Sequence, residues 1–270
     1  MRKFLKAFRL VFLSLPRVIF DFFTWIIPYS NHPERYPIEK RYDKARRLVI
    51  FLLRNMHFDL SLTGKEFFHV GEPTLFVANH VAALDPLALI AISKQPVSFI
   101  SKKENEKTFV VGRFIKAIDG LFLDREDAFQ AVRLFREAKA NMERERISYC
   151  IYPEGTRIQD RYSRTTLPFH PGSLKIAYMA QSPIVLFVQF GSFHVLDKKP
   201  GSWHPLIMKG LYRLEYADYS SEKSVALTKK LRDDINAALP AIVDQDDEYY
   251  ALKKGKKKPE KWWRALLEEM

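Results

Sequence analysis

The chain has 270 residues, 47% of them hydrophobic, which is enough for a substantial core and excludes disorder as its main state. Its single cysteine, Cys150, excludes an internal disulfide framework and any multi-cysteine metal site, and it fits a reducing compartment. The net charge of +12 lies at the ends: residues 1–50 hold 11 Lys and Arg against 4 Asp and Glu, whereas residues 51–250 hold 26 against 25. A nearly neutral middle argues against nucleic acid as a partner.

The first 60 residues are rich in apolar and basic side chains and predict membrane-associated helices. Charged residues and a proline interrupt residues 4–28 before a charge-free run reaches the ~18 residues that a spanning helix needs. A second apolar stretch covers residues 47–56, and Pro28–Pro33 predicts a turn between the two. We therefore expect residues 1–60 to form an amphipathic helical hairpin on an anionic membrane surface, as a monotopic or peripheral protein at the cytoplasmic face of the cell membrane.

From Gly64 onward, short strand-like runs alternate with helical ones. The predicted strands cover residues 74–78, 97–101, 121–123, 148–152, 184–189, 207–208 and 212–216. The predicted helices cover residues 86–93, 128–145, 174–180 and 224–239. This alternation predicts an α/β domain over residues 61–247, with a mostly parallel central sheet flanked by helices. Residues 248–270 form a basic tail with Trp262 and Trp263, which is either a second membrane contact or a solvated, partly disordered end.

The spacing of glycines and histidines excludes several kinds of site. The ten glycines are never fewer than seven residues apart, so a dinucleotide fingerprint, a P-loop and a nucleophile elbow are all absent. The seven histidines are never closer than ten residues, so there is no local zinc-binding pair. We therefore expect neither a metal nor a cofactor. Arg and Lys side chains must hold any bound anion, and a scattered His or carboxylate must act as any catalytic base.

His80 is the best candidate for that base. It follows the apolar strand 74–78, and ligands of α/β folds usually bind at strand ends. An imidazole there can take a proton from a hydroxyl at neutral pH, and Asp85, five residues on, is placed to hold its other ring nitrogen. The alternative is purely structural, because Asp85 before Pro86 is also a good helix start.

Two further blocks carry charged side chains after predicted strands. The first ends in Arg125, which either clamps a phosphate or pairs with Asp124 or Asp127 at the surface. The second is a tight turn that places Glu154 and Arg157 side by side. Taken alone, neither block separates a functional role from an ordinary surface role.

Taken together, the order and spacing of these blocks resemble the 1-acylglycerol-3-phosphate O-acyltransferase (lysophosphatidic acid acyltransferase) family of the glycerolipid acyltransferase superfamily. The matching segments are Asn-His-x4-Asp at Asn79–Asp85, a Gly-x-x-Phe-x-Asp-Arg-like block at Gly120–Arg125, Pro-Glu-Gly-Thr-Arg within Tyr152–Arg157, and Ser182–Val185. Segments 102–104 and 169–175 also look like the connecting segments of that family, and the resemblance covers roughly residues 61–215. Tyr152 and Ser182 stand where Phe and Val are usual, which leaves chain-length and acceptor preference open.

The resemblance implies a role for each matching residue. His80 deprotonates the acceptor hydroxyl, which attacks the thioester directly without an acyl-enzyme, and Asp85 orients His80. The residues implied in binding the acceptor phosphate are Lys103, Arg125, Glu154, Gly155, Thr156 and Arg157. Those implied in the acyl or acceptor pocket are Asn79, Gly120, Phe122, Pro153 and Pro183. Cys150, inside a predicted strand, is expected to belong to the core rather than to act as nucleophile.

The implied reaction transfers a fatty acyl group from acyl-CoA or acyl carrier protein to lysophosphatidic acid in the membrane, giving phosphatidic acid. Two alternatives remain open at the level of sequence. The same chemistry can act on glycerol 3-phosphate, another lysophospholipid or a glycolipid. Alternatively, the chain is a non-catalytic membrane-binding lipid protein.

Overall fold

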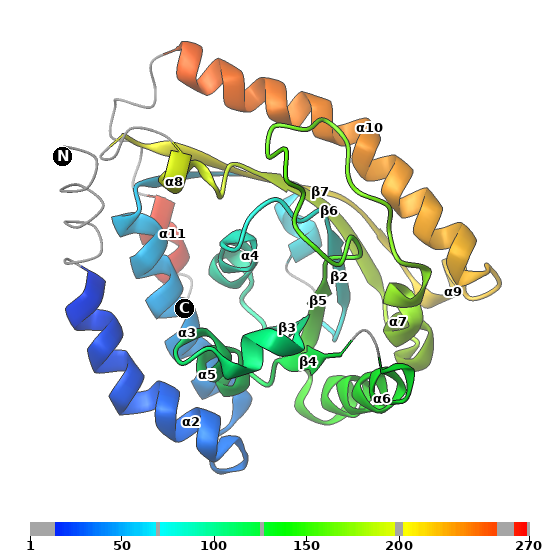
Figure 1. Cartoon of the computed structure of the whole chain (residues 1–270), viewed down its shortest axis with the longest axis horizontal. Coiled ribbons are helices and arrows are strands. Elements are labelled where there is room, and N and C mark those ends of the chain that lie inside the picture. The colour runs from blue at the N-terminus through cyan, green and yellow to red at the C-terminus, as the bar shows by residue number, and fades with distance from the viewer. Residues whose placement is uncertain (1–13, 69–70, 125–126, 198–201, 253–261, 269–270) are drawn as a thin grey trace.

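A single seven-stranded sheet organises the chain, in the order β1-β7-β6-β2-β5-β3-β4 (Figure 1). The computed structural model describes residues 14–68, 71–124, 127–197, 202–252 and 262–268. The strands are β1 (Phe58–Thr63), β2 (Leu75–Ala78), β3 (Val97–Lys102), β4 (Leu121–Leu123), β5 (Ser148–Ile151), β6 (Ile184–Phe190) and β7 (His204–Leu214). All neighbouring strands are parallel except the antiparallel pair of β6 and β7. The prediction of a mostly parallel sheet is confirmed.

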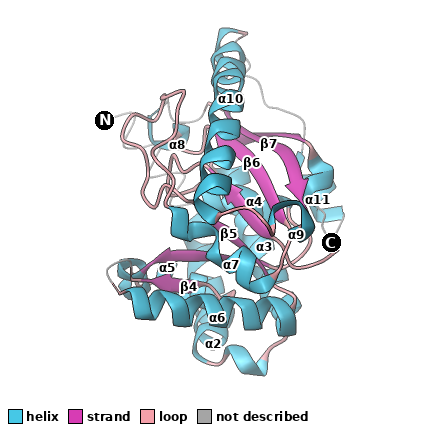
Figure 2. Ribbon diagram, turned by 90° about the vertical axis from the view of Figure 1, so that its right-hand side faces the viewer, coloured by secondary structure: helices cyan, strands magenta, loops and turns pink. Residues whose placement is uncertain are grey.

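Helices connect the strands and cover both faces of the sheet (Figure 2). The longer described ones are α3 (Ile38–Asn55), α4 (Asp85–Ile92), α5 (Val111–Ala117), α6 (Ala128–Glu145), α10 (Ser224–Ala251) and α11 (Trp262–Glu268). The shorter ones are η1 (Phe22–Ile26), α2 (Ile27–Asn31), η2 (Pro33–Arg35), η3 (Lys65–Phe68), η4 (Lys103–Lys107), η5 (Pro171–Leu174), α7 (Lys175–Ala180), α8 (His194–Asp197) and α9 (Tyr216–Tyr219).

Strand β2 shows how the two faces of the sheet are buried. Because successive side chains of a strand point to opposite faces, Phe76 and Ala78 pack into a core shared with α3 and α4. Leu75 and Val77 pack into a second core, shared with α6, α7 and α10. Every residue of this strand is buried, as expected for a parallel strand covered on both sides.

The N-terminal segment forms a helical hairpin, although its turn lies later than predicted. Residues 14–31 are helical throughout, so the turn predicted at Pro28–Pro33 is wrong over residues 28–31. Pro28 follows the π-helical turn η1, at whose end the Ile27 N–H donates to the Phe22 carbonyl oxygen, five residues back. At the open end of the hairpin the Asn55 Nδ2 atom donates to Ser14 Oγ at 3.3 Å. Residues 1–13 lie outside the described residues.

No helix within the described ranges combines the length and apolarity needed to cross a bilayer. The C-terminal α11 instead packs on the domain, where Trp263 is buried and the Trp262 Nε1 atom donates to the Phe58 carbonyl oxygen at 2.8 Å. This differs from both alternatives predicted for the two tryptophans, namely a membrane contact or a solvated end. The lysines at 253–261 lie outside the described residues.

Candidate active site

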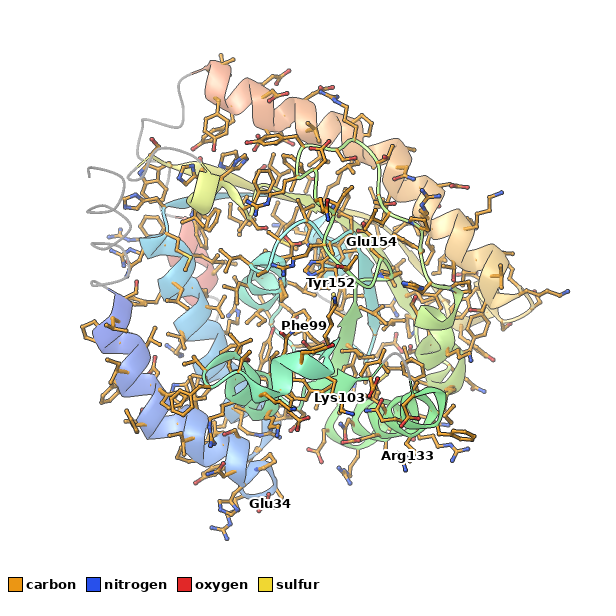
Figure 3. All side chains as sticks on the ribbon, in the orientation of Figure 1. Glu34, Phe99, Lys103, Arg133, Tyr152 and Glu154 are labelled. Carbon is orange, nitrogen blue, oxygen red and sulfur yellow. The ribbon has the colours of Figure 1, made fainter. Side chains whose placement is uncertain are left out.

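The carboxyl ends of the parallel strands bring together the segments that carry the predicted site. His80 follows β2, Glu154 follows β5 and Ser192 follows β6, and both β5 and β6 are hydrogen-bonded neighbours of β2. Tyr152 and Glu154 lie near the middle of the molecule, with Lys103 below them in the same view (Figure 3). This is the edge at which α/β domains usually bind their ligands.

His80 and Asp85 form a hydrogen-bonded pair. The His80 Nδ1 atom lies 2.8 Å from Asp85 Oδ2, and the histidine side chain is 18% exposed, whereas the aspartate side chain is buried. Because a carboxylate only accepts, Nδ1 carries the proton, and Nε2 is left with a free lone pair. The Tyr152 ring stacks on the imidazole with 4.3 Å between ring centroids and fixes its plane. A neutral imidazole held in this way is suited to accept a proton.

Asp85 is itself held by three further donors. Its Oδ2 atom accepts the backbone N–H groups of Val81 at 2.7 Å and Ala82 at 2.9 Å, and its Oδ1 atom accepts the Ser192 hydroxyl. A buried carboxylate that accepts from this many donors is held in one orientation. Ser192 was not predicted from the sequence, because it lies more than 100 residues from Asp85. Its position just after strand β6 was the one feature that could have indicated a place in the site.

The Glu154 side chain links its own turn to the backbone at His80 and at Leu167. It is buried, and its Oε1 and Oε2 atoms accept the backbone N–H groups of His80 at 2.6 Å and Leu167 at 2.9 Å. Burial raises the pKa of this carboxyl, and the two hydrogen bonds act against that rise. One oxygen thus positions the His80 backbone and the other the Leu167 backbone, so both carboxyl oxygens are engaged within the protein.

Asn79 joins the ends of β2 and β6. Its side chain bonds to both backbone groups of Gln189 at 2.9 Å, and the Gln189 amide donates back to the Asn79 carbonyl oxygen at 3.1 Å. Predicted as a pocket residue, Asn79 has its amide fully engaged here. Its contribution to the site is to fix the backbone next to His80.

Three cationic residues were predicted to bind phosphate. Arg157 is exposed, and its guanidinium bonds to none of the described residues, while the next residue, Ile158, donates its backbone N–H to the His80 carbonyl oxygen at 3.3 Å. The Lys103 ammonium donates to Asp124 at 2.8 Å, and this hydrogen bond raises the pKa of the lysine. Arg125 lies outside the described residues. Of the two described cations in this set, Arg157 is therefore the one whose guanidinium is unpaired and whose next residue bonds to the His80 backbone.

The remaining predicted residues mostly shape the backbone. Gly155 has a φ of +71°, which glycine tolerates best, and it closes the turn by donating to Tyr152. A Cβ at Gly120 would lie 2.3 Å from the Ile115 side chain, so this glycine allows close packing of α5. Pro153 and Pro183 are buried, Phe122 is partly buried and Thr156 is exposed.

Cys150 lies in the core, as expected, between β2 and β3. Burial raises the pKa of its thiol, so little thiolate forms at neutral pH. We predict that iodoacetamide leaves the acyl-transfer activity of the native protein unchanged and labels Cys150 only after denaturation. Mass spectrometry with parallel activity assays checks this, and inactivation in step with labelling would contradict it.

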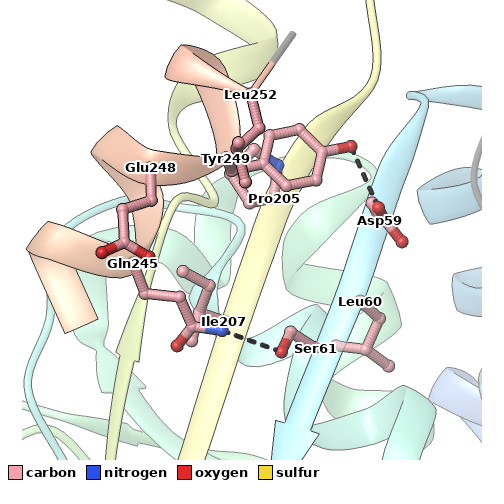
Figure 4. A pocket seen from close by; sticks show the side chains of 9 residues that line it. All are labelled: Asp59, Leu60, Ser61, Pro205, Ile207, Gln245, Glu248, Tyr249 and Leu252. Carbon is pink, nitrogen blue, oxygen red and sulfur yellow. Dashed lines mark hydrogen bonds between the residues drawn. The ribbon is translucent and has the colours of Figure 1, made fainter. Parts of the chain in front are cut away.

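One cavity in the described part of the chain lies away from this site (Figure 4). It has a volume of about 410 Å³ and lies between β1, β7 and the end of α10. Its polar side chains bond to one another, with Tyr249 donating to Asp59 at 3.0 Å and Gln245 to Ser61 at 3.2 Å. None of the predicted site residues lines it.

Comparisons with known proteins identify the family of this chain. A family model described as "Acyltransferase" matches residues 59–188, which include His80, Asp85 and Arg157. A probable 1-acyl-sn-glycerol-3-phosphate acyltransferase of Mycoplasma pneumoniae is 34% identical over 205 residues, which is 73% of this chain and 74% of the relative. The human 1-acyl-sn-glycerol-3-phosphate acyltransferase beta is 31% identical over 129 residues, 47% of this chain and 45% of its own.

A solved structure shares the fold. The 1-acyl-sn-glycerophosphate (LPA) acyltransferase PlsC from Thermotoga maritima superposes with a TM-score of 0.66 at 22% identity, covering 89% of this chain and 96% of that one. The family model, the relatives and the shared fold thus define an α/β acyltransferase. More narrowly, this chain belongs to the 1-acylglycerol-3-phosphate O-acyltransferase family.

Proposed function

We propose that the protein transfers a fatty acyl group from acyl-CoA or acyl carrier protein to the free hydroxyl of 1-acylglycerol 3-phosphate, giving phosphatidic acid. The observation that carries the proposal is the His80–Asp85 pair, whose ring is partly exposed while its carboxylate partner is fully buried. Membership of a family whose relatives bear the name of this reaction supports the choice of acceptor.

In the proposed reaction, His80 is the general base. Its Nε2 atom takes the proton of the acceptor hydroxyl as the oxygen attacks the carbonyl carbon of the thioester. The carbon–sulfur bond then breaks, and the thiolate leaves with the proton that the imidazolium returns. Asp85 stabilises the imidazolium between these two steps. Binding both substrates in one orientation supplies much of the remaining rate enhancement.

We assign the acceptor phosphate to Arg157, with Lys103 and Arg125 as further cations. Arg157→Ala is expected to raise the KM for 1-acylglycerol 3-phosphate by ~10–100-fold, because a charge-assisted hydrogen bond is worth ~1.5–3 kcal/mol. The KM for the acyl donor should stay the same. Steady-state kinetics with each substrate varied in turn checks this.

Two controls separate phosphate binding from a general effect of lost charge. Arg164→Ala removes an exposed arginine that pairs with Asp244 at 2.7 Å, and it should leave both KM values unchanged. With a monoacylglycerol that lacks the phosphate, wild type and Arg157→Ala should turn over equally slowly. A change in the donor KM alone would reverse the assignment of the two pockets.

We also infer that residues 1–60 dock the enzyme on the cytoplasmic face of the membrane, where the acceptor resides. The helix of residues 14–31 supports this, because Leu15, Ile19 and Phe20 are exposed on it and the first 50 residues are strongly basic. An enzyme held there draws its lipid acceptor laterally, while the thioester arrives from water.

The acceptor is tested by incubating the protein with a radiolabelled acyl thioester and separate acceptors. Labelled phosphatidic acid should form from 1-acylglycerol 3-phosphate at a higher kcat/KM than the products from glycerol 3-phosphate, lysophosphatidylcholine or a glycolipid. A higher kcat/KM for one of those acceptors would replace the proposed acceptor, and release of no thiol with any of them would remove the enzymatic proposal.

A further inference from the structure

Large apolar side chains are exposed on two segments that are distant in sequence but adjacent in space. On the helix of residues 14–31, Phe23 is 64% exposed, and in the loop before α5, Phe109 is 69% exposed. The buried Phe22 ring contacts both of them, with its centroid 5.4 Å from that of Phe23 and 4.8 Å from that of Phe109. The helix and the loop therefore hold their exposed rings close together, around one buried ring.

The loop projects from a rigid base. A Cβ at Gly112 would lie 2.4 Å from the Glu106 carbonyl oxygen, so α5 begins in close contact with η4. The Gly112 N–H donates to Thr108 at 3.0 Å, and Phe114 donates to the Val110 carbonyl oxygen at 2.9 Å. These contacts hold the backbone on both sides of Phe109 in a position that leaves Phe109, Val110 and Val111 exposed.

A groove with basic side chains adjoins the apolar residues. It has a volume of about 280 Å³ and is lined by residues of α2, η4 and α5. Helices α2 and α5 lie side by side in Figure 1. Its charged lining residues are Lys107, Arg113 and Lys116, with Glu106 as the only acid. Lys116 pairs with that acid at 2.8 Å, and Arg113 donates to the neutral Asn31 side chain at 2.8 Å. The groove thus keeps an excess of positive charge next to the exposed apolar side chains around Phe109. This combination suits an anionic lipid, whose phosphate can bind in the groove.

This surface follows directly after a strand that ends at the proposed catalytic edge of the sheet. Segment η4 starts directly after β3, at the same carboxyl edge that β2 uses to present His80. A bilayer that contacts Phe109 therefore faces the side of the sheet from which the acceptor must reach the imidazole.

We propose that Phe109, Val110 and Val111 insert into the bilayer together with the exposed face of the helix of residues 14–31, and that Lys107, Arg113 and Lys116 receive the phosphate of an anionic lipid. This inference rests on the proposed membrane docking of residues 1–60 and adds a second contact to it. Two contacts fix the orientation of the enzyme, whereas one helix alone leaves it free to roll about the helix axis.

The test compares two pairs of substitutions by cosedimentation with vesicles of equal parts phosphatidylcholine and phosphatidylglycerol. Phe109→Ser with Val111→Ser should weaken vesicle binding by a factor on the order of ten or more, from the apolar area withdrawn from the bilayer. Phe129→Ser with Val225→Ser is the matched control, because these side chains are 85% and 62% exposed on α6 and α10. That pair should bind as wild type does.

A second comparison tests the groove. Lys107→Gln with Lys116→Gln should weaken binding to the anionic vesicles by about fivefold per lysine and leave binding to pure phosphatidylcholine unchanged. Lys229→Gln with Lys230→Gln, on exposed positions of α10, should change neither. All variants should acylate a dissolved short-chain 1-acylglycerol 3-phosphate at the wild-type rate, which shows that they fold.

The possible failures are distinguishable. If wild type binds the vesicles and the Phe109 and Val111 pair binds equally well, the second contact is wrong, whereas docking by residues 1–60 stands. If wild type does not bind them at all, the proposed docking fails and the second contact fails with it. Loss of activity toward the dissolved acceptor in the Phe109 and Val111 pair would also overturn the inference, because the loop would then serve catalysis directly.

Discussion

Replacing His80 with alanine is expected to lower kcat for acyl transfer by ~10²–10⁴-fold, the usual contribution of a positioned base. The fold should survive, because the three other groups that donate to Asp85 come from Val81, Ala82 and Ser192 and remain in place. The backbone N–H of residue 80 also still donates to Glu154. Single-turnover rates and thermal unfolding, measured on the same preparation, check both statements.

His32→Ala is the matched control, because it removes an exposed imidazole from the helical hairpin. It should leave kcat toward a dissolved acceptor unchanged. Near-normal turnover of His80→Ala would remove this residue from the reaction, and a large drop in its melting temperature would make its kinetics uninformative. In the latter case His80→Gln, which keeps a polar side chain of similar reach, decides the matter.

The order of strands and helices is largely readable from the sequence. The strand at 121–123 and the helix at 128–145 were predicted with the observed bounds, because apolar spacing and flanking polar residues agree there. Asp127 caps the N-terminus of this helix, where its side chain accepts the Gln130 N–H at 2.8 Å, and aspartate is a preferred residue at that position.

Three elements differ in presence or bounds from the sequence prediction, because tertiary packing outweighs the local sequence pattern there. Strand β1 was missed because its alternating residues, from Phe58 on, follow closely on a long amphipathic helix. Strand β7 was expected as two pieces, but Gly210 lies inside it, where a Cβ would come within 2.7 Å of the Gly64 carbonyl oxygen. Helix α10 was expected to end before Pro240, yet it continues, because Ile242 and Val243 bury their side chains in the core beyond it.

The site was predictable only where its residues are neighbours in sequence. His80 and Asp85 lie in one strand-to-helix turn, so their pairing follows from spacing. Ser192 reaches Asp85 only because β6 lies beside β2, and a strand order of this kind is set by the whole sheet. Glu154 was predicted in the right turn, but its inward orientation depends on the backbone N–H of Leu167, 13 residues further along the same loop.

Asp85→Asn is expected to lower kcat by ~10²-fold, which is less than the ~10⁴-fold cost of the same change in a serine-protease triad. In such a triad the amide can donate to the histidine and fix the wrong tautomer. Here the N–H groups of Val81 and Ala82 point at the same oxygen as His80 does, so the amide oxygen must face all three. The new amide nitrogen then faces Ser192, whose hydroxyl can accept instead of donate.

The asparagine variant should therefore keep the histidine tautomer and the fold and lose mainly the negative charge that stabilises the imidazolium. Asp85→Ala, in contrast, leaves four donors without an acceptor, three of them buried, so it should lose the activity and also ~3–5 kcal/mol of unfolding free energy. Ser192→Ala removes one donor and should reduce kcat by less than Asp85→Asn does, with an unchanged acceptor KM.

Chemical denaturation, together with kinetics on the three variants, checks this order. Equal losses in Asp85→Asn and His80→Ala would show that the backbone donors do not control the amide, and full activity in Asp85→Asn would show that the carboxylate charge has no part in the reaction.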